Sequence, residues 1–516
     1  MIYKEESPMR DTGPAPQATE PTGRLRRAAL ATAAAVLALP LVALAGPVRP
    51  AVADTVATME RHLDALQTIA DQNNGNRAAG SSGFRASVDY AARAFEKAGY
   101  DVTRQRFEIT TFRLTERPEV AVVRPERQRL RERKDYLIAN FSGSASLQRP
   151  VVPAGGTRVP PPADGKGLTS GCSADDFPAE TRGAIALVQR GGCMLTQKFE
   201  NAERAGAKAM LLFNSGLPDE KEVMTITAEN GNTLPIVFLS YRAGRDLLRS
   251  AEARRTVVRL DIRGKVLTKP TWNVIADSRG GDPERTLVVG GHLDSVPDGP
   301  GINDNGSGIA LVLVAAQQMA ERGETPRNRV RFALWAAEEM GLLGSVHYVA
   351  TLSKRERKRI FAYLNFDMVA SPNYVRFVDE TLANPASVAI GDDFRAAFKR
   401  KGLVSEHFDS GGRTDTFAFI EAGIPAAGLF SGAEGEKTKS QQKRYGGRAG
   451  EPYDACYHQP CDTLENISKR ALRQFSAAAF EVIGEMARQK PSLPQATAAA
   501  GASAPPPRYK GPYAQY

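Results

Sequence analysis

The spacing of apolar residues predicts helices and strands that alternate in two separate parts of the chain. Over residues 56–70 and 84–98 apolar side chains recur every three or four positions, as on one face of a helix. Gly99 ends the second run. Residues 100–110 alternate instead and predict a strand. After Asn273, strands over 286–290, 330–335 and 363–366 alternate with helices over 309–321 and 354–359. This order predicts an α/β sheet with helices on both faces.

The stretch between these two parts has a different pattern of apolar and turn-forming residues. From about residue 119 to 265, short β-like runs are separated by Pro/Gly clusters such as 160–162. We therefore predict one α/β domain (54–117 and 266–490) interrupted by a β-rich insert (118–265). The Ala/Pro/Ser-rich residues 491–516 predict a disordered tail.

Composition excludes several classes of protein. Of the 516 residues, 42% are hydrophobic and 24% are charged. This composition is typical of globular proteins and excludes a wholly disordered chain, a collagen or a coiled coil. The net charge of +10 is spread along the chain, with no basic run interleaved with aromatic residues. We interpret it as a solvated surface and expect no nucleic-acid partner.

The N-terminus predicts export. Arg24, Arg26 and Arg27 precede an apolar run over 28–45, and small residues follow it up to Ala53. This pattern is typical of a secretory signal, so residues 1–53 are interpreted as signal peptide and leader of a secreted protein without a membrane attachment after cleavage. An uncleaved membrane anchor is the alternative, because the run approaches the ~20 residues that span a bilayer.

The cysteines fall into two close pairs, Cys172 with Cys193 and Cys456 with Cys461. In an exported protein this even count predicts two local disulfides. The alternative is four unpaired thiols in the core.

Candidate chemistry lies where the predicted strands end. The apolar residues 287–289 lead into Gly290-Gly291-His292-Leu293-Asp294, and Asp304 sits in a glycine-flanked turn before the helix at 309. Ligands of open α/β sheets gather at the carboxyl ends of strands. Each feature alone also fits an ordinary structural histidine or a helix-capping turn.

Further candidates follow the next two strands. Glu338 and Glu339 come after the strand at 330–335, and Asp367 follows the strand at 363–366. His458 lies inside the Cys456–Cys461 loop. The five residues His292, Asp304, Glu339, Asp367 and His458 suit zinc, and Asp304 is the candidate to bridge two ions. Glu338 is then free to take a proton from water, which predicts a hydrolase.

These motifs match a known family. The strings GGHLDSV, GINDNGSG, WAAEEMGLLGS, NFDMV and CYHQPCDT closely resemble those of secreted bacterial di-zinc aminopeptidases of the leucyl type. The strings GCSADDF, IALVQRGGC and KFENAERAGAKAMLLFN resemble a protease-associated (PA) domain, which interrupts some members. The resemblance implies the zinc-exopeptidase fold, a mixed and mostly parallel sheet flanked by helices.

The resemblance also implies roles. One zinc would be held by His292 and Asp367 and the other by Glu339 and His458, with Asp304 shared. Asp294 would orient His292, Glu338 would be the general base and Tyr457 would polarise the substrate carbonyl. The backbone of Arg413 would help to bind the substrate's α-amino group. Acidic residues that build a calcium site in some relatives are replaced by basic ones at 469–473.

The resulting expectation is a monomeric, two-zinc aminopeptidase that removes large apolar residues from the N-termini of peptides and proteins. A carboxypeptidase or amidohydrolase on the same scaffold is one alternative. A catalytically silent binding ectodomain is the other.

Overall fold

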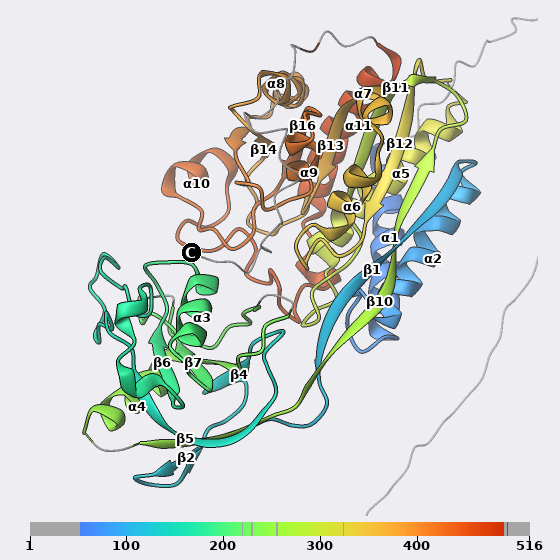
Figure 1. Ribbon diagram of the computed structural model, residues 1–516. Helices are drawn as coiled ribbons and strands as arrows, with labels where there is room; N and C mark the ends of the chain where they lie inside the picture. Colours follow the sequence, from blue (N-terminus) through green and yellow to red (C-terminus); the bar gives the residue numbers. More distant parts are fainter. Residues whose placement is uncertain are drawn as a thin grey trace, which may run out of the picture. The chain divides into compact units, whose positions relative to one another are not determined.

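The computed structural model describes residues 52–218, 220–228, 231–253, 256–323, 325–489 and 493. Most of the predicted signal peptide and leader, and all but Leu493 of the predicted tail, lie outside the described residues. Among the residues described, no helix is both long and apolar enough to cross a bilayer. Figure 1 shows the arrangement of the elements.

The α/β part of the chain surrounds the insert in sequence. Its elements are α1 (Val52–Asp71), α2 (Ser82–Lys97), β1 (Asp101–Leu114), β10 (Gly264–Asp277), β11 (Asp282–His292), α5 (Gly308–Glu321), β12 (Asn328–Trp335), α6 (Leu343–Thr351), α7 (Lys354–Arg359), β13 (Ile360–Phe366), β14 (Phe377–Glu380), α8 (Pro385–Arg400), β15 (Glu406–Phe408), α9 (Thr416–Glu421), β16 (Ala426–Phe430), α10 (Lys439–Tyr445) and α11 (Lys469–Arg488).

These strands form one sheet in the order β1-β10-β12-β11-β13-β16-β14-β15. The central strands β12, β11, β13 and β16 are parallel to one another. On one side, β10 runs antiparallel to both β12 and β1, and on the other, β14 runs antiparallel to β16. The predicted α/β class, with a mixed and mostly parallel sheet, is confirmed.

Successive residues of the central strands pack into two different hydrophobic cores, one on each face of the sheet. Leu287 and Val289 of β11 join a core with α1, α2, α5, α8 and α11, whereas Val288 joins one with α6 and α9. On β12, Phe332 and Trp335 divide in the same way. Helices therefore cover both faces, so both faces of the strands are apolar and their carboxyl ends are left as the accessible edge.

The insert has its own sheet and its own cores. Its elements are β2 (Glu119–Arg124), β3 (Gln128–Arg129), β4 (Tyr136–Ile138), β5 (Ala145–Pro153), β6 (Ile185–Gln189), α3 (Leu195–Arg204), β7 (Ala209–Phe213), β8 (Ile236–Leu239), α4 (Tyr241–Ala253) and β9 (Val257–Ile262). The strand order is β3-β2-β9-β5-β6-β7-β8-β4. The chain leaves the first sheet at the end of β1 and returns at the start of β10.

Both predicted disulfides form, Cys172–Cys193 in the insert and Cys456–Cys461 before α11. No free cysteine is present among the residues described. The alternative of four unpaired thiols is therefore wrong.

Candidate active site

Three neighbouring parallel strands carry predicted site residues to one edge of the sheet. His292 is the last residue of β11, Glu338 and Glu339 follow β12, and Asp367 follows β13 directly. Since β12 and β13 both flank β11 in parallel, their carboxyl ends meet at the same edge. Asp304 joins them from the turn Ile302–Ser307 before α5. His458 comes from the Cys456–Cys461 loop.

The donor atoms of these side chains converge in two groups. His292 Nε2 lies 3.3 Å from Asp367 Oδ1, and His458 Nε2 lies 3.1 Å from Glu339 Oε2. Asp304 belongs to both groups, because its Oδ1 is 3.1 Å from His292 Nε2 and its Oδ2 is 3.2 Å from His458 Nε2. The structure thus brings together all five residues that the sequence predicted as ligands.

The cluster is buried on one side and open on the other. The His292 side chain is 1% exposed and that of Glu339 is 8% exposed, whereas Asp367 and His458 are 18% and 27% exposed. A molecule from solvent therefore reaches the donor atoms past Asp367 and His458.

Hydrogen bonds hold the outer parts of the cluster. The Asp294 carboxylate accepts a hydrogen bond from the Glu338 backbone N–H at 3.1 Å. His292 Nδ1 is 3.1 Å from the Asp294 carbonyl oxygen but 3.7 Å from its carboxylate. Asp294 therefore contacts His292 mainly through its backbone, while its side chain fixes the loop that carries Glu338. The Thr414 hydroxyl donates to Asp367 Oδ2 at 2.9 Å.

A second set of contacts shapes the Asp304 turn. The two carboxylate oxygens of Asp462 accept the backbone N–H groups of Asn303 and Asp304 at 2.8 and 2.9 Å. Gly301, at φ +65°, permits the turn, since a Cβ there would lie 2.3 Å from the Asp304 carbonyl oxygen. Asp462 directly follows Cys461, so one short loop positions both His458 and the Asp304 turn.

Arg77 reaches the same region from the segment between α1 and α2. Its guanidinium is fully buried and donates to the backbone carbonyls of Leu293, Pro300 and Gly301 at 2.5–3.0 Å. Burial lowers its pKa to about 10, while Asp294, Asp462 and other nearby acids oppose that shift. Arg77 therefore places a fixed positive charge behind the loops that carry His292 and Asp304.

Thr414, Asp462 and Arg77 were not predicted as site residues. A signal existed for Asp462, which is the first residue after the predicted Cys loop. Thr414 directly follows Arg413, which the family resemblance marked as a site residue, whereas Arg77 lies far in sequence from the metal motifs.

The carboxylates of the cluster favour protonated groups beside them, as the pKa values of His458 and Glu339 show. Burial lowers the pKa of His458, but Glu339 and Asp304 outweigh it and raise that pKa to about 11. Burial and its acidic neighbours, Asp304 among them, raise the pKa of Glu339 to about 7, with His458 opposing. Like charges this close repel unless protons or a cation lie between them.

The residues therefore fit zinc on chemical grounds. The set combines imidazole nitrogens and carboxylate oxygens, the donors that zinc takes. One donor atom each of His292, Asp304 and Glu339 lies within 4.8 Å of the others. Glu339 Oε1 is buried and has no hydrogen-bond partner among the described residues, which is costly unless a cation supplies one.

Tyr457 and Arg413 lie beside the cluster rather than in it. The ring of Tyr457 stacks on that of His458 with centroids 3.8 Å apart, and burial followed by nearby acids raises its pKa well above the usual value. The Arg413 guanidinium faces Glu434, with Nη1 3.0 Å from Oε1, and its side chain is 59% exposed.

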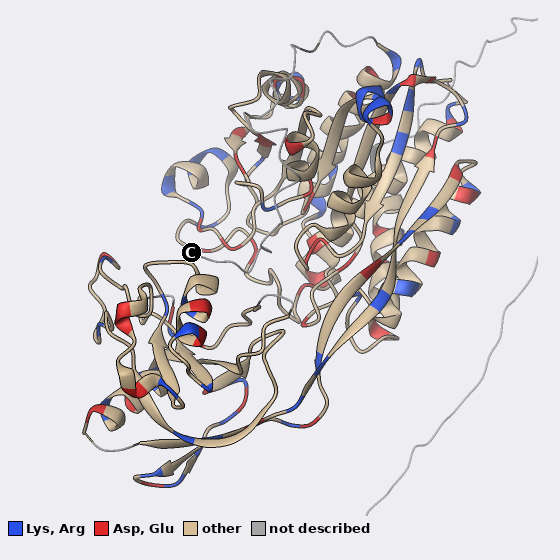
Figure 2. Ribbon diagram, viewed as in Figure 1, with Lys and Arg blue, Asp and Glu red and all other residues tan. Residues whose placement is uncertain are grey.

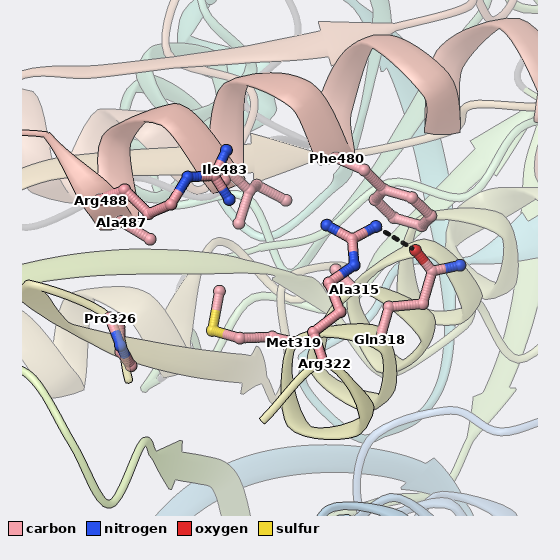
Figure 3. Close-up of a pocket in the computed structure, with 10 residues that line it drawn as sticks. Ala315, Gln318, Met319, Arg322, Pro326, Phe480, Ile483, Ala487 and Arg488 are labelled. Atoms are coloured by element: carbon pink, nitrogen blue, oxygen red, sulfur yellow. Dashed lines mark hydrogen bonds between the residues drawn. The ribbon is translucent and has the colours of Figure 1, made fainter. Parts of the chain in front are cut away.

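A separate hollow between α5 and α11 contains none of these residues. It is lined by Met319, Arg322, Ile483, Arg488 and neighbouring side chains (Figure 3). It therefore plays no part in the site described above.

Comparisons with known proteins identify the family of the chain. Residues 273–483 match the model of peptidase family M28, and residues 150–247 match that of the PA domain. The chain is 39% identical over 454 residues to an aminopeptidase of Pseudomonas aeruginosa, covering 86% of this chain and 83% of that protein. It is 37% identical over 442 residues to the probable lipoprotein aminopeptidase LpqL of Mycobacterium tuberculosis, covering 83% of this chain and 84% of that protein.

A solved structure shares the architecture. A zinc aminopeptidase from Bacillus subtilis is similar to this chain with a TM-score of 0.65 and 27% identity, over 86% of this chain and 97% of that one.

Imidazole and carboxylate donors at the carboxyl edge of an α/β sheet fit a metal-dependent enzyme. The similarity to aminopeptidases and to a zinc aminopeptidase structure narrows the class of this protein to zinc-dependent peptide hydrolases. The chain belongs to peptidase family M28, carries a PA domain and is an aminopeptidase.

Proposed function

We propose that the chain is a secreted aminopeptidase that holds two zinc ions and releases large apolar residues from peptide N-termini. The observation that carries the proposal is the position of Asp304, whose two carboxylate oxygens face two different imidazoles, His292 and His458. A carboxylate shared in this way supports two ions, one held with Asp367 and the other with Glu339. Export is supported by the two disulfides, which persist in oxidising compartments.

Bound zinc would polarise the scissile carbonyl and make water a better nucleophile at neutral pH. Glu338 lies outside this ligand set, and its Oε2 is 3.9 Å from His292 Nε2, the imidazole nitrogen that faces Asp304 and Asp367. We assign it to take the proton of the attacking water and deliver it to the leaving amine. Its position depends on Asp294, which holds its backbone N–H.

Tyr457 is assigned to the substrate carbonyl. Because burial raises the pKa of its phenol well above the usual value, the hydroxyl stays protonated at neutral pH and can donate a hydrogen bond as charge develops on the carbonyl oxygen. Such a donor is typically worth about 3–4 kcal/mol in the transition state.

Recognition of a free amine is supported by the charge of the site. The Asp367 carboxylate, with a side chain that is 18% exposed, lies on its open side, where it attracts an ammonium group. The candidate clamp for a substrate carboxylate, Arg413, is paired with Glu434, its Nη1 3.0 Å from Oε1. This favours an aminopeptidase over a carboxypeptidase, and leaves the backbone carbonyl of Arg413 as the proposed acceptor for the amine.

The apolar preference is supported by aromatic side chains at the same edge of the sheet. Phe430, at the end of β16, is partly buried, and its ring packs on Phe408 with centroids 4.9 Å apart. The backbone N–H of Asp367 donates to the carbonyl of Leu429, next to Phe430. We assign the ring of Phe430, whose neighbour Leu429 contacts the proposed ligand Asp367, to the pocket that takes an apolar substrate side chain.

The test compares leucine p-nitroanilide with its N-acetylated form, with and without chelator. We expect cleavage of the free-amine substrate alone, loss of activity on chelation, recovery with zinc, and two zinc ions per chain by metal analysis. Equal cleavage of both substrates would disprove recognition of the amine. A single zinc in the fully active protein would disprove the two-ion site.

A further inference from the structure

The helix α7 concentrates positive charge at one place on the surface. Five of its six residues are basic (KRERKR). Lys354, Arg355, Lys358 and Arg359, here called the α7 basic patch, line a shallow hollow together with Glu284. Lys354, Arg355 and Lys358 are exposed, and the blue ribbon of α7 in Figure 2 shows the concentration of charge.

Carboxylates of the protein neutralise only part of this charge. Glu284 contacts Arg359 and lies 3.6 Å from the Arg355 guanidinium. Among the described residues, neither Lys354 nor Lys358 has a carboxylate oxygen within 4.0 Å of its Nζ. Two exposed ammonium groups of the patch are thus available to a partner.

The helix carries these charges at a cost to its own stability. Lys354 and Lys358, like Arg355 and Arg359, are four residues apart and lie on the same face, where like charges destabilise a helix by a few tenths of a kcal/mol per pair. The helix dipole favours Lys358 and Arg359 in the last turn but opposes Lys354 and Arg355 in the first. Helix formation therefore does not account for these four cations together.

We propose that the α7 basic patch binds a linear polyanionic glycan, one that carries repeated sulfate or carboxylate groups. Two parallel rows of cations suit a chain of regularly spaced anions. No aromatic side chain lines the hollow, so nucleic-acid bases have nothing to stack on. The exposed large apolar residues of the described chain are Val266, Leu382 and Val404, none of which lies on α7. A lipid surface therefore finds no apolar anchor there.

The position of the patch leaves the active site free. The patch precedes β13, and the seven residues of that strand, about 23 Å in length, separate it from Asp367 at the other end. A glycan bound at α7 would therefore hold the enzyme on a polymer while peptides still enter the site.

The experiment measures binding of the full chain to heparin and to polygalacturonate at 50 mM NaCl, with polyphosphate, single-stranded DNA and anionic vesicles as other probes. The variant K354Q/R355Q/K358Q removes the exposed cations of the patch. The control K97Q/K208Q/R473Q removes three exposed cations elsewhere. We expect the patch variant to bind at least one glycan about tenfold or more weakly, the control to lose less than about twofold, and both to hydrolyse leucine p-nitroanilide normally.

Heparin and polygalacturonate distinguish a sulfated from a carboxylated partner. The proposal fails if neither glycan binds the wild-type chain, or if both triple variants weaken binding equally, which would indicate net charge alone. It also fails if DNA or vesicles bind more tightly than both glycans and depend on the same three residues. Since hydrolysis is measured separately, failure here is distinguishable from failure of the proposed aminopeptidase activity.

Discussion

Glu338 and Glu339 are adjacent in sequence, but their carboxylates face different partners. Glu339 Oε2 lies 3.1 Å from His458 Nε2, within reach of an ion shared with that imidazole. Glu338 is held by its backbone to Asp294 and lies 3.9 Å from the nearest imidazole nitrogen. The pair therefore offers a matched comparison between a proposed base and a proposed ligand.

We predict that Glu338→Gln lowers kcat by about 10²–10⁴, the usual contribution of a general base, and leaves the zinc content unchanged. Glu339→Gln should instead lower the zinc content, because an amide is a poorer ligand than a carboxylate. Metal analysis of both variants beside kinetics on leucine p-nitroanilide makes the comparison. Loss of zinc from the Glu338 variant would remove the basis for its role as base.

Sequence reasoning found the residues that follow a strand and missed those that contact the site from elsewhere. His292, Glu339 and Asp367 are visible because an apolar strand ends in a polar residue, and parallel strands bring such ends together. His458 is visible because a short Cys loop encloses it. Thr414 adjoins the predicted site residue Arg413, but its contact with Asp367, like the contacts of Arg77, depends on how distant loops fold over the sheet edge.

At the scale of elements, the Cys456–Cys461 loop and the turn before α5 act as one unit. Asp462 accepts two backbone N–H groups of that turn, and Asn466 donates to Asp462 at 3.2 Å. The loop that carries His458 thereby also fixes the position of Asp304.

We predict that Asp462→Asn weakens zinc binding by about 10- to 100-fold, the usual cost of removing a group that orients a ligand. An asparagine has an NH2 donor in place of one of the two carboxylate oxygens, so one of the two backbone N–H groups would face a donor and lose its hydrogen bond. Zinc competition with a chromogenic chelator measures the affinity. Glu465→Gln, an exposed change three residues later, is the control and should bind zinc normally. Equal zinc affinity in the Asp462 variant and the wild type would contradict the coupling.

Helix α3 of the insert carries a buried lysine. Lys198 Nζ donates to the Ser170 carbonyl beside the Cys172–Cys193 disulfide. Burial lowers its pKa from 10.5 to about 8, with a small opposing effect of Asp176. Between about pH 8 and 10.5 the unfolded chain therefore binds more protons at this residue than the folded chain does.

From this difference we predict that Lys198 destabilises the insert most below pH 8 and that the penalty disappears as the pH rises to 10.5. Thermal unfolding at pH 7.5 and 10 measures the effect. Relative to wild type, Lys198→Met should lack this rise in stability with pH, and Lys208→Met, an exposed change nearby in sequence, should keep it. An identical pH response in all three proteins would show that Lys198 has an ordinary pKa.

At the scale of the whole chain, the described residues form two sets of hydrophobic cores, each built from its own part of the sequence. The cores of the insert are built from residues 120–262, and those of the α/β part from residues on either side. The alternating pattern of the sequence predicted this division, although its boundaries remain a prediction. The sequence pattern could not predict how far the β1–β10 ladder extends, because that depends on pairing between residues 150 to 176 positions apart.

The ladder gives the last prediction. Its final cross-strand bond runs from the backbone N–H of Thr115 to the carbonyl of Arg263 at 2.8 Å, so the chain enters and leaves the insert at one point. Replacing residues 116–262 by an Asn-Gly turn, which suits a tight antiparallel hairpin, should give a folded protein that still cleaves leucine p-nitroanilide. Folded but inactive protein would show that the insert contributes to catalysis.

The junction between the β1–β10 hairpin and the insert also has a consequence for how the two parts are joined in one chain. Both ends of the insert lie next to one cross-strand hydrogen bond, between Thr115 and Arg263. A domain inserted between these two residues therefore leaves the pairing register of β1 and β10 unchanged. The junction therefore lets the insert be exchanged or removed as a separate folding module while the hairpin of the α/β part keeps its pairing.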